Sequence, residues 1–226
     1  MRILAFESVP STQDQAFELL SQGERTPFCV WAREQTRGRG RLDRVWISER
    51  DRSLTLSLAY RLPANVLSGL SLAIGLGILK CLPESAPLKL KWPNDIMLND
   101  HKVGGILIES RSQSEKAEVV IGIGLNLTTL ESAPYRGLDF SLAPEQIVEG
   151  VEEVMTILQT HGFEGLRERY ETKLWRKGEV QHLRTSEGLV SALVQGVDEW
   201  GRLKTMEAGT LTLRENGEIL VTPSAH

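Results

Sequence analysis

The chain has 226 residues, of which 41% are hydrophobic and 25% charged, and its 26 Lys and Arg against 30 Asp and Glu give a net charge of −4. This length and composition predict a globular protein of one ordinary domain, or one domain with a small appendage. The acidic balance argues against a protein that binds nucleic acid over its whole surface, because such a surface needs a basic field.

Apolar stretches and cysteines indicate the cellular compartment in which the chain works. The longest apolar stretch, 66–82, is interrupted by serines, glycines and Lys80, so it predicts a core helix and no membrane span. The apolar run at the N-terminus is too short for a signal peptide. Cys29 and Cys81 each lie in an apolar stretch, which is typical of reduced, buried thiols. We therefore expect a cytoplasmic protein.

Helical and strand-like patterns alternate up to about residue 177. The hydroxyls of Ser11 and Thr12 predict a helix start, and apolar residues at helical spacing continue to Leu20. Pro144 opens another helix, whose apolar residues continue to Leu158. Strands are predicted at 28–32, 53–60, 88–92, 96–98, 102–109 and 117–125, a hairpin turn at 99–101, and further helices at 65–82 and 163–175.

Beyond Lys177 and Gly178 the pattern changes to short strands separated by turns. These strands are predicted at 180–183, 189–197, 202–206, 210–213 and 218–222. The C-terminal pattern is typical of a small β-barrel attached to a mixed α/β domain. We expect the division to fall between 1–177 and 178–226.

The segment from Gln35 to Trp46 carries four arginines, at positions 37, 39, 41 and 44, and glycines at 38 and 40. Glycine lets a backbone close around a ligand, and guanidinium groups bind phosphate or acyl-phosphate. The segment by itself is ambiguous. A solvated turn and a nonspecific nucleic-acid contact have the same composition.

Three later motifs decide between these readings: Lys91-Trp-Pro-Asn-Asp95, Lys102-Val-Gly-Gly105 and Gly122-Ile-Gly-Leu-Asn126. In the first, proline ends a strand and leaves Asn94 and Asp95 at its end, where ligand sites of α/β proteins collect, although a plain Asx turn uses the same residues. In the other two, glycines lie within strands, where they cost stability unless something approaches the backbone. No third glycine follows at dinucleotide spacing, so a Rossmann site is excluded.

In this order, the arginine segment and the three motifs resemble the biotin protein ligase family, over about residues 7–221. The resemblance implies an α+β fold: a mixed β-sheet with flanking helices, as in class II synthetase-like biotin ligase catalytic domains, plus a small C-terminal SH3-like β-barrel. It implies that biotin and MgATP are the substrates of a first step that makes biotinyl-5'-AMP. The biotinyl group then passes to a lysine of a biotin carboxyl carrier protein.

The resemblance also implies roles for particular residues. Lys102, Arg39 and Arg41 would be catalytic, because their charges can stabilise the phosphate as the biotin carboxylate attacks it. The biotin-binding residues would be Ser11, Thr12, Gln35, Gly38, Arg39, Gly40, Lys102, Gly105, Gly122 and Gly124. The ATP-binding residues would be Arg39, Arg41, Trp46, Asn94, Asp95, Lys102 and Asn126, with Asp95 a candidate Mg²⁺ ligand.

Two positions depart from the family pattern. Gln13 stands where an asparagine usually follows the Ser-Thr pair, and Asp43 stands where a glycine is common. Asp tolerates left-handed backbone angles better than most residues, so we expect the turn at Asp43 to survive. Because the first motif begins at Ser11, no N-terminal helix-turn-helix and no DNA binding are expected, while a homodimer is compatible with the resemblance.

Two alternative functions stay open at this point. One is a lipoate or octanoyl protein ligase of the same fold, which would carry a different arginine–glycine signature and a characteristic histidine segment. The other is a non-catalytic nucleic-acid-binding module that uses the arginine segment. Biotin-dependent exchange of pyrophosphate into ATP would separate the three, since only a biotin ligase should catalyse it.

Overall fold

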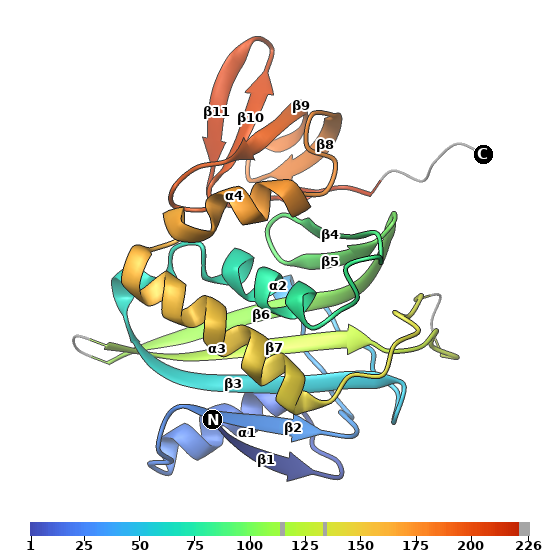
Figure 1. Cartoon of the computed structure of the whole chain (residues 1–226), viewed down its shortest axis with the longest axis vertical. Coiled ribbons are helices and arrows are strands. Elements are labelled where there is room, and N and C mark those ends of the chain that lie inside the picture. The colour runs from blue at the N-terminus through green and yellow to red at the C-terminus, as the bar shows by residue number, and fades with distance from the viewer. Residues whose placement is uncertain (114–115, 133–134, 222–226) are drawn as a thin grey trace.

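The computed structural model describes residues 1–113, 116–132 and 135–221, and its main feature is a seven-stranded mixed sheet (Figure 1). Across the sheet the strands are β1 (Arg2–Phe6), β2 (Phe28–Ala32), β3 (Ser53–Pro63), β7 (Lys116–Asn126), β6 (His101–Gln113), β5 (Asp95–Leu98) and β4 (Leu88–Lys91). Only the first pair, β1 and β2, is parallel. The α+β class expected from the sequence is confirmed.

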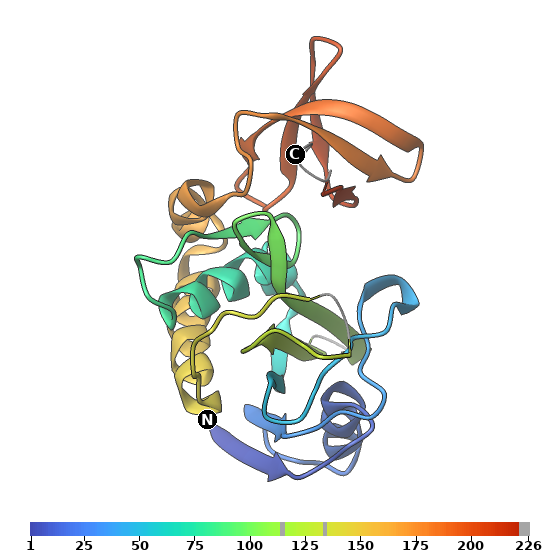
Figure 2. The same cartoon turned by 90° about the vertical axis from the view of Figure 1, so that its right-hand side faces the viewer.

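Helices cover both faces of this sheet. The helices are α1 (Thr12–Ser21), α2 (Leu70–Lys80), α3 (Pro144–His161) and α4 (Glu164–Lys173), with short 3₁₀ turns η1 (Arg41–Asp43) and η2 (Ala64–Leu67). Figure 2 shows α2 and α3 on one side of the sheet and α1 on the other. No helix within the described ranges is both long enough and apolar enough to span a membrane.

Strand alternation separates the main core from the opposite face of the sheet. On β3, Leu54, Leu56 and Leu58 point into a large buried cluster that α2 and α3 cover. The residues between them, including Thr55 and Ser57, are buried on the other face. Because successive side chains of a strand point to opposite faces, this second face is free to carry polar groups. The candidate site lies on it.

A second, antiparallel sheet follows α4. Across this sheet the strands are β11 (Thr210–Arg214), β10 (Leu203–Glu207), β9 (Gly188–Val197), β8 (Val180–Thr185) and β12 (Glu218–Ile219). A small C-terminal β unit is thus confirmed, but in the described residues its edge strands β11 and β12 do not pair, so the sheet is open and not a closed barrel. The last expected strand, 218–222, ends in β12 at Ile219, and residue 222 lies outside the described residues.

Two elements differ from the expectation. Strand β1 was not anticipated, because its five residues gain their partner only by parallel pairing with β2, which no local pattern reveals. The helix expected at 65–82 is instead η2 followed by α2, because Gly69 between them has a φ of 69°. A side chain at Gly69 would also collide with Phe163, whose ring carbon Cγ lies 2.4 Å from the Cβ position.

Candidate active site

The pairing register of the central strands brings the separate sequence motifs into adjacent rows. Asp95 of β5 pairs with Gly105 of β6, and Gly105 pairs with Gly124 of β7. In the next row, Leu107 pairs with Gly122, which pairs with Ser57 of β3. Side chains and bare glycine backbone from four strands therefore form one surface.

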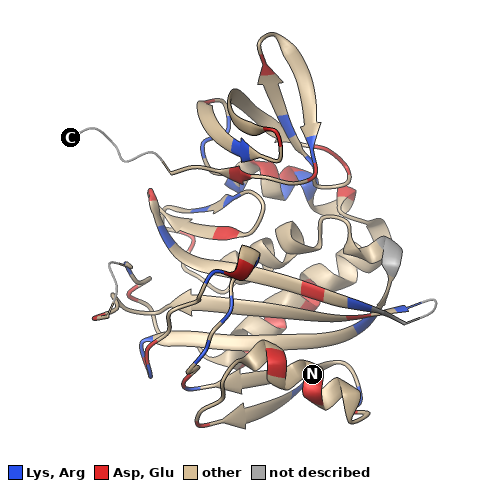
Figure 3. Ribbon diagram, turned by 180° about the vertical axis from the view of Figure 1, so that it is seen from behind, with Lys and Arg blue, Asp and Glu red and all other residues tan. Residues whose placement is uncertain are grey.

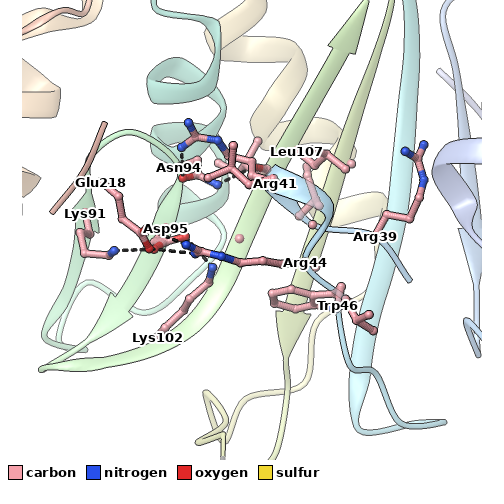
Figure 4. Close-up of a pocket in the computed structure, with 18 of the residues that line it drawn as sticks. Arg39, Arg41, Arg44, Trp46, Lys91, Asn94, Asp95, Lys102, Leu107 and Glu218 are labelled. Carbon is pink, nitrogen blue, oxygen red and sulfur yellow. Dashed lines mark hydrogen bonds and ion pairs between the residues drawn. The ribbon is translucent and has the colours of Figure 1, made fainter. Parts of the chain in front are cut away.

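A cavity of about 740 Å³ lies over this surface, between the arginine segment and the C-terminal sheet (Figure 4). Every residue that the resemblance assigned to biotin or ATP lines it except Gly38. The lining members are Ser11, Thr12, Gln35, Arg39, Gly40, Arg41, Trp46, Asn94, Asp95, Lys102, Gly105, Gly122, Gly124 and Asn126. Gly38 lies behind Trp46, where a Cβ would stand 2.5 Å from the Trp46 carbonyl oxygen.

Asp95 links two lysines at one end of the cavity. Its Oδ2 lies 2.8 Å from Lys91 Nζ and its Oδ1 lies 2.6 Å from Lys102 Nζ. Burial alone would raise the pKa of Asp95, but the charges of Lys102 and Lys91 outweigh burial and lower it. Asp95 is therefore a carboxylate, and it fixes Lys102, the less buried of the two lysines, at the cavity surface.

This geometry does not suit Asp95 as a resident Mg²⁺ ligand. Both carboxylate oxygens already accept an ammonium group, and the three side chains together carry a charge of +1. In the described ranges, no group of three or more His, Cys, Asp or Glu side chains is placed to hold a metal ion. A magnesium ion would have to enter with the phosphates of ATP, as part of the substrate.

Arg41 and Arg44 hold the arginine segment against two other elements. Arg41 Nη1 donates to Asn94 Oδ1 at 2.9 Å, and Asn94 Nδ2 donates to the Ile106 carbonyl at 2.9 Å. Arg44 makes a two-point ion pair with Glu218 of β12, at 2.9 and 2.7 Å. Asn94 thus positions a guanidinium, and β12 reaches the cavity.

Arg39 does not join this cluster. Its guanidinium donates to both carboxylate oxygens of Glu109, at 2.9 and 2.8 Å, and lies 2.9 Å from Asp14. Figure 4 shows the side chain directed away from Asp95 and Lys102. To contact an anion beside Lys102, Arg39 would have to leave both carboxylates.

Trp46 covers much of the glycine surface. A Cβ on Gly124 would stand 2.4 Å from its indole carbon Cε2, and a Cβ on Gly105 would stand 3.3 Å from Cζ3. At Gly124 only glycine permits this contact, and at Gly105 a Cβ would press on both the indole and Lys102, so the indole helps to account for two of the four strand glycines in these motifs. The Trp46 Nε1 donor and the Asn126 Oδ1 acceptor are both buried without a partner among the described residues.

The turn within the arginine segment adopts the expected left-handed angles. Asp43 has a φ of 57° and its neighbour Leu42 a φ of 55°. A left-handed leucine costs about 1–2 kcal/mol, and this one is also 74% exposed. The strain falls on a segment that lines the cavity, where backbone strain in proteins often collects.

Hydroxyl and amide groups occupy a different part of the cavity. Gln35 Oε1 accepts from the Thr12 backbone N–H at 2.8 Å and lies 3.0 Å from Thr12 Oγ1. Ser11 Oγ caps α1 by accepting from the Asp14 N–H at 3.4 Å. Ser57 and Gln13 extend the group deeper, and all five residues line the cavity.

Sequence reasoning missed four of the residues that build this site: Lys91, Glu218, Ser57 and Gln13. Lys91 lies inside a recognised motif, and Gln13 stood out as a departure, so both had a signal. Glu218 and Ser57 read as ordinary strand residues, because only the packing of β12 and the register of β3 bring them to the cavity.

The charge of the cavity differs from that of the whole chain. Six cationic side chains, Arg39, Arg41, Arg44, Lys91, Lys102 and Arg184, line it against the two carboxylates Asp95 and Glu218. A chain with a net charge of −4 thus concentrates positive charge in one cavity. This arrangement fits a ligand with a negatively charged part and a neutral polar part.

Comparisons with known proteins agree with this geometry. Residues 5–126 match the Biotin/lipoate A/B protein ligase family. A biotin–[acetyl-CoA-carboxylase] ligase of Paracoccus denitrificans is 32% identical, over 85% of this chain and 89% of the relative. The bifunctional ligase/repressor BirA of Bacillus subtilis is 28% identical, over 89% of this chain and 68% of the relative. The Aquifex aeolicus biotin protein ligase, solved with biotin and ATP, superposes with a TM-score of 0.80 at 25% identity and covers 97% of both chains.

Proposed function

This chain belongs to the Biotin/lipoate A/B protein ligase family, and from that premise we infer that it is a biotin protein ligase. It activates biotin with ATP to biotinyl-5'-AMP and transfers the biotinyl group to a protein. We propose that the acceptor is a lysine of a biotin carboxyl carrier protein, as the name of the Paracoccus relative suggests.

One observation carries this proposal: a single cavity joins a neutral polar end to a cationic end. The polar end, with Ser11, Thr12 and Gln35, suits the ureido ring of biotin, which needs paired donors and acceptors. The cationic end, with Lys102 and Arg41, suits a carboxylate that must approach a phosphate. Biotinyl-5'-AMP has both parts in one molecule.

In the first step, an oxygen of the biotin carboxylate attacks the α-phosphorus of ATP and pyrophosphate leaves. Two anions must meet, and negative charge builds on the α-phosphate as the new P–O bond forms. Lys102 supplies an ammonium group that Asp95 holds at the cavity surface. Arg41 supplies a guanidinium that Asn94 orients. We propose that Arg39 joins them after it leaves Glu109 and Asp14.

In the second step, the neutral amine of an acceptor lysine attacks the acyl carbon of the mixed anhydride. The C–O bond to AMP breaks, AMP leaves with the bonding electrons, and the amide nitrogen releases a proton. Trp46 and the arginine segment cover the cavity, and in our proposal they keep water from hydrolysing the anhydride before the amine arrives.

The two alternative functions are less well supported. A lipoyl or octanoyl group has no ureido N–H to offer the acceptors of Thr12 and Gln35, and an unpaired buried polar group weakens binding. A nucleic-acid-binding surface needs clustered positive charge on an open face, whereas the clustered cations of this chain line the cavity. Figure 3 shows Lys and Arg interspersed with Asp and Glu along the ribbon.

Biotin-dependent exchange of labelled pyrophosphate into ATP tests the proposal. We expect exchange with biotin and none with lipoate or octanoate at the same concentration. Exchange with lipoate but not biotin would replace the proposal with the lipoate alternative, and no exchange with any of the acids would refute the ligase assignment.

The setting of the enzyme is also part of the proposal. Both cysteines, Cys29 and Cys81, are free thiols, in keeping with the reducing cytoplasm that we propose. The 226 residues carry a net charge of −4, and we therefore propose that they do not bind DNA. A homodimer is compatible with this proposal.

A further inference from the structure

Lys91 is a nearly fully buried cation, and the two reaction steps above do not use it. Its side chain is 4% exposed, against 39% for Lys102. Taking an ammonium group out of water is costly, and an apolar side chain of similar volume often packs as well or better. Buried charges beside a cavity are typical of functional sites. Packing alone therefore does not explain a lysine at this position.

Two neighbours fix the ammonium group of Lys91. It lies 2.8 Å from Asp95 Oδ2, and it donates to the Ile219 carbonyl of β12 at 3.0 Å. Lys91 and Asp95 are paired residues of β4 and β5, so one neighbour belongs to the main sheet and the other to the C-terminal sheet. Lys91 thus ties Asp95 to β12.

The contact with Lys91 decides how the Asp95 carboxylate is turned. The terminal torsion of an aspartate is soft, so a carboxylate by itself can rotate widely. Lys91 holds Oδ2, which leaves Oδ1 for Lys102 at 2.6 Å. Figure 4 shows the side chains of Lys91 and Lys102 both directed at Asp95. Without Lys91, both oxygens would be open to the Lys102 ammonium group, which would then have no single position.

Lys91 also sets the charge beside Lys102. Asp95 and Lys102 alone would form a neutral pair, whereas the three side chains together carry a charge of +1. Arg44 and Glu218 lie close by but form an ion pair of their own. An ammonium group whose charge is not cancelled attracts a carboxylate or a phosphate more strongly, and a charge inside protein acts more strongly than one in water.

We propose that Lys91 is a positioning residue, which clamps the Asp95 carboxylate against β12 so that Lys102 meets the biotin carboxylate in one place and with its charge intact. The inference rests on the proposed function and deepens it, because it names what holds the catalytic lysine ready. It also gives the C-terminal sheet a part in the first step, through the Ile219 carbonyl.

Lys91→Met in the full chain tests the inference, because methionine keeps the volume and removes the charge. We expect kcat in pyrophosphate exchange to fall about 10- to 100-fold, since a small displacement of a catalytic group can cost this much. The matched control is Lys89→Met on the same strand, whose native ammonium group donates to the Thr172 carbonyl. This control should keep the wild-type kcat.

Calorimetric binding of biotin and of biotin methyl ester, without ATP, provides a readout that a disturbed cavity would not give. The ester has the same ring and chain but no negative charge. Lys91→Met should bind biotin about 10-fold more weakly, as for the loss of one hydrogen bond to a charged group, and should bind the ester as tightly as the wild type does. Equal weakening of both ligands would overturn the inference.

The same substitution in a Lys102→Ala background shows whether Lys91 acts through Lys102. If it does, the double variant binds biotin no more weakly than Lys102→Ala alone. A further loss in the double variant would mean that Lys91 attracts the ligand directly and would overturn the inference, as would wild-type binding and exchange in Lys91→Met.

Lys91→Gln, which loses the charge but keeps a donor, carries the same measurements if Lys91→Met does not fold. A wild type that neither binds biotin nor catalyses exchange would instead refute the proposed function.

Discussion

Ion pairs hold individual side chains of this site in position, as packing does elsewhere in the fold. Lys102 lies on a strand, where an exposed lysine is usually an edge protector. Here Asp95 accepts its ammonium group at 2.6 Å, and Lys91 occupies the other carboxylate oxygen. A long, flexible side chain is thereby held in one place before any substrate arrives, which reduces the cost of ordering it in the transition state.

Lys102→Ala should abolish most adenylate formation without unfolding the chain. The substitution removes a positive charge where negative charge develops, and we expect pyrophosphate exchange to fall by about 10²- to 10³-fold, the range seen for loss of one such group. Lys89→Ala is the matched control, because Lys89 belongs to β4, two strands away from β6 in the same sheet, and its ammonium group donates to the Thr172 carbonyl. Near wild-type exchange in Lys102→Ala would contradict its catalytic role.

At the scale of elements, the arginine segment depends on a strand far away in sequence. Arg44 pairs with Glu218 of β12, and Arg184 of β8 lies 3.6 Å from the same carboxylate. The hydrogen bonds and charge of Arg44 lower the pKa of Glu218 to about 2. The C-terminal sheet therefore supports the segment that covers the cavity.

Glu218→Gln should show how much stability this contact provides. A carboxylate whose pKa is lower in the folded than in the unfolded chain stabilises the fold above the unfolded pKa, and this contribution is lost as the pH falls. For Glu218 the window runs from about 4.5 down to about 2. The pair is partly exposed, so we expect the wild type to exceed the variant by at most about 1 kcal/mol at pH 7, with the difference shrinking at pH 3.

Urea unfolding of both proteins at pH 7 and pH 3 measures this difference. Glu215→Gln is a control in the turn before β12, where the carboxylate is far more exposed and lies 3.9 Å from Arg202. A difference between wild type and Glu218→Gln that is the same at both pH values would show that the ion pair with Arg44 does not stabilise the fold.

At the scale of the whole molecule, the two sheets share one buried cluster. Leu183, Val194 and Ile219 of the C-terminal sheet belong to the same hydrophobic core as the leucines of β3. Polar contacts join them too, since Lys91 Nζ donates to the Ile219 carbonyl at 3.0 Å and Trp92 Nε1 donates to the Gly201 carbonyl at 3.1 Å. The proposed division into 1–177 and 178–226 separates two sheets but not two cores.

We therefore expect the chain to unfold in a single thermal transition. Leu183→Ala removes a fully buried side chain of β8, which typically costs about 2–5 kcal/mol, and it should lower the one transition temperature as a whole. Differential scanning calorimetry measures both quantities. Two separate transitions, or a shift confined to one of two, would mean that the C-terminal sheet folds independently.

Local features of the sequence were enough to predict the strand-rich fold, the change of pattern near residue 178 and fourteen of the residues that line the cavity. These predictions were possible because hydrophobic alternation, strand glycines and an arginine-rich turn are local features, which can be recognised without knowing how the chain folds. The left-handed angle at Asp43 was predictable for the same reason. Gln13 was visible as a departure from the family pattern, but its contact with Ser57 was not.

Contacts between residues far apart in the chain became known only from the tertiary structure. The packing of α1 on β3 and β7 places Gln13 beside Ser57, and the packing of β12 brings Glu218 to Arg44. The partners of Arg39 and the cover that Trp46 gives to Gly124 depend likewise on long-range packing. Hydrogen bonds and ion pairs act over a few ångströms, so which groups meet is fixed only when the strands have paired.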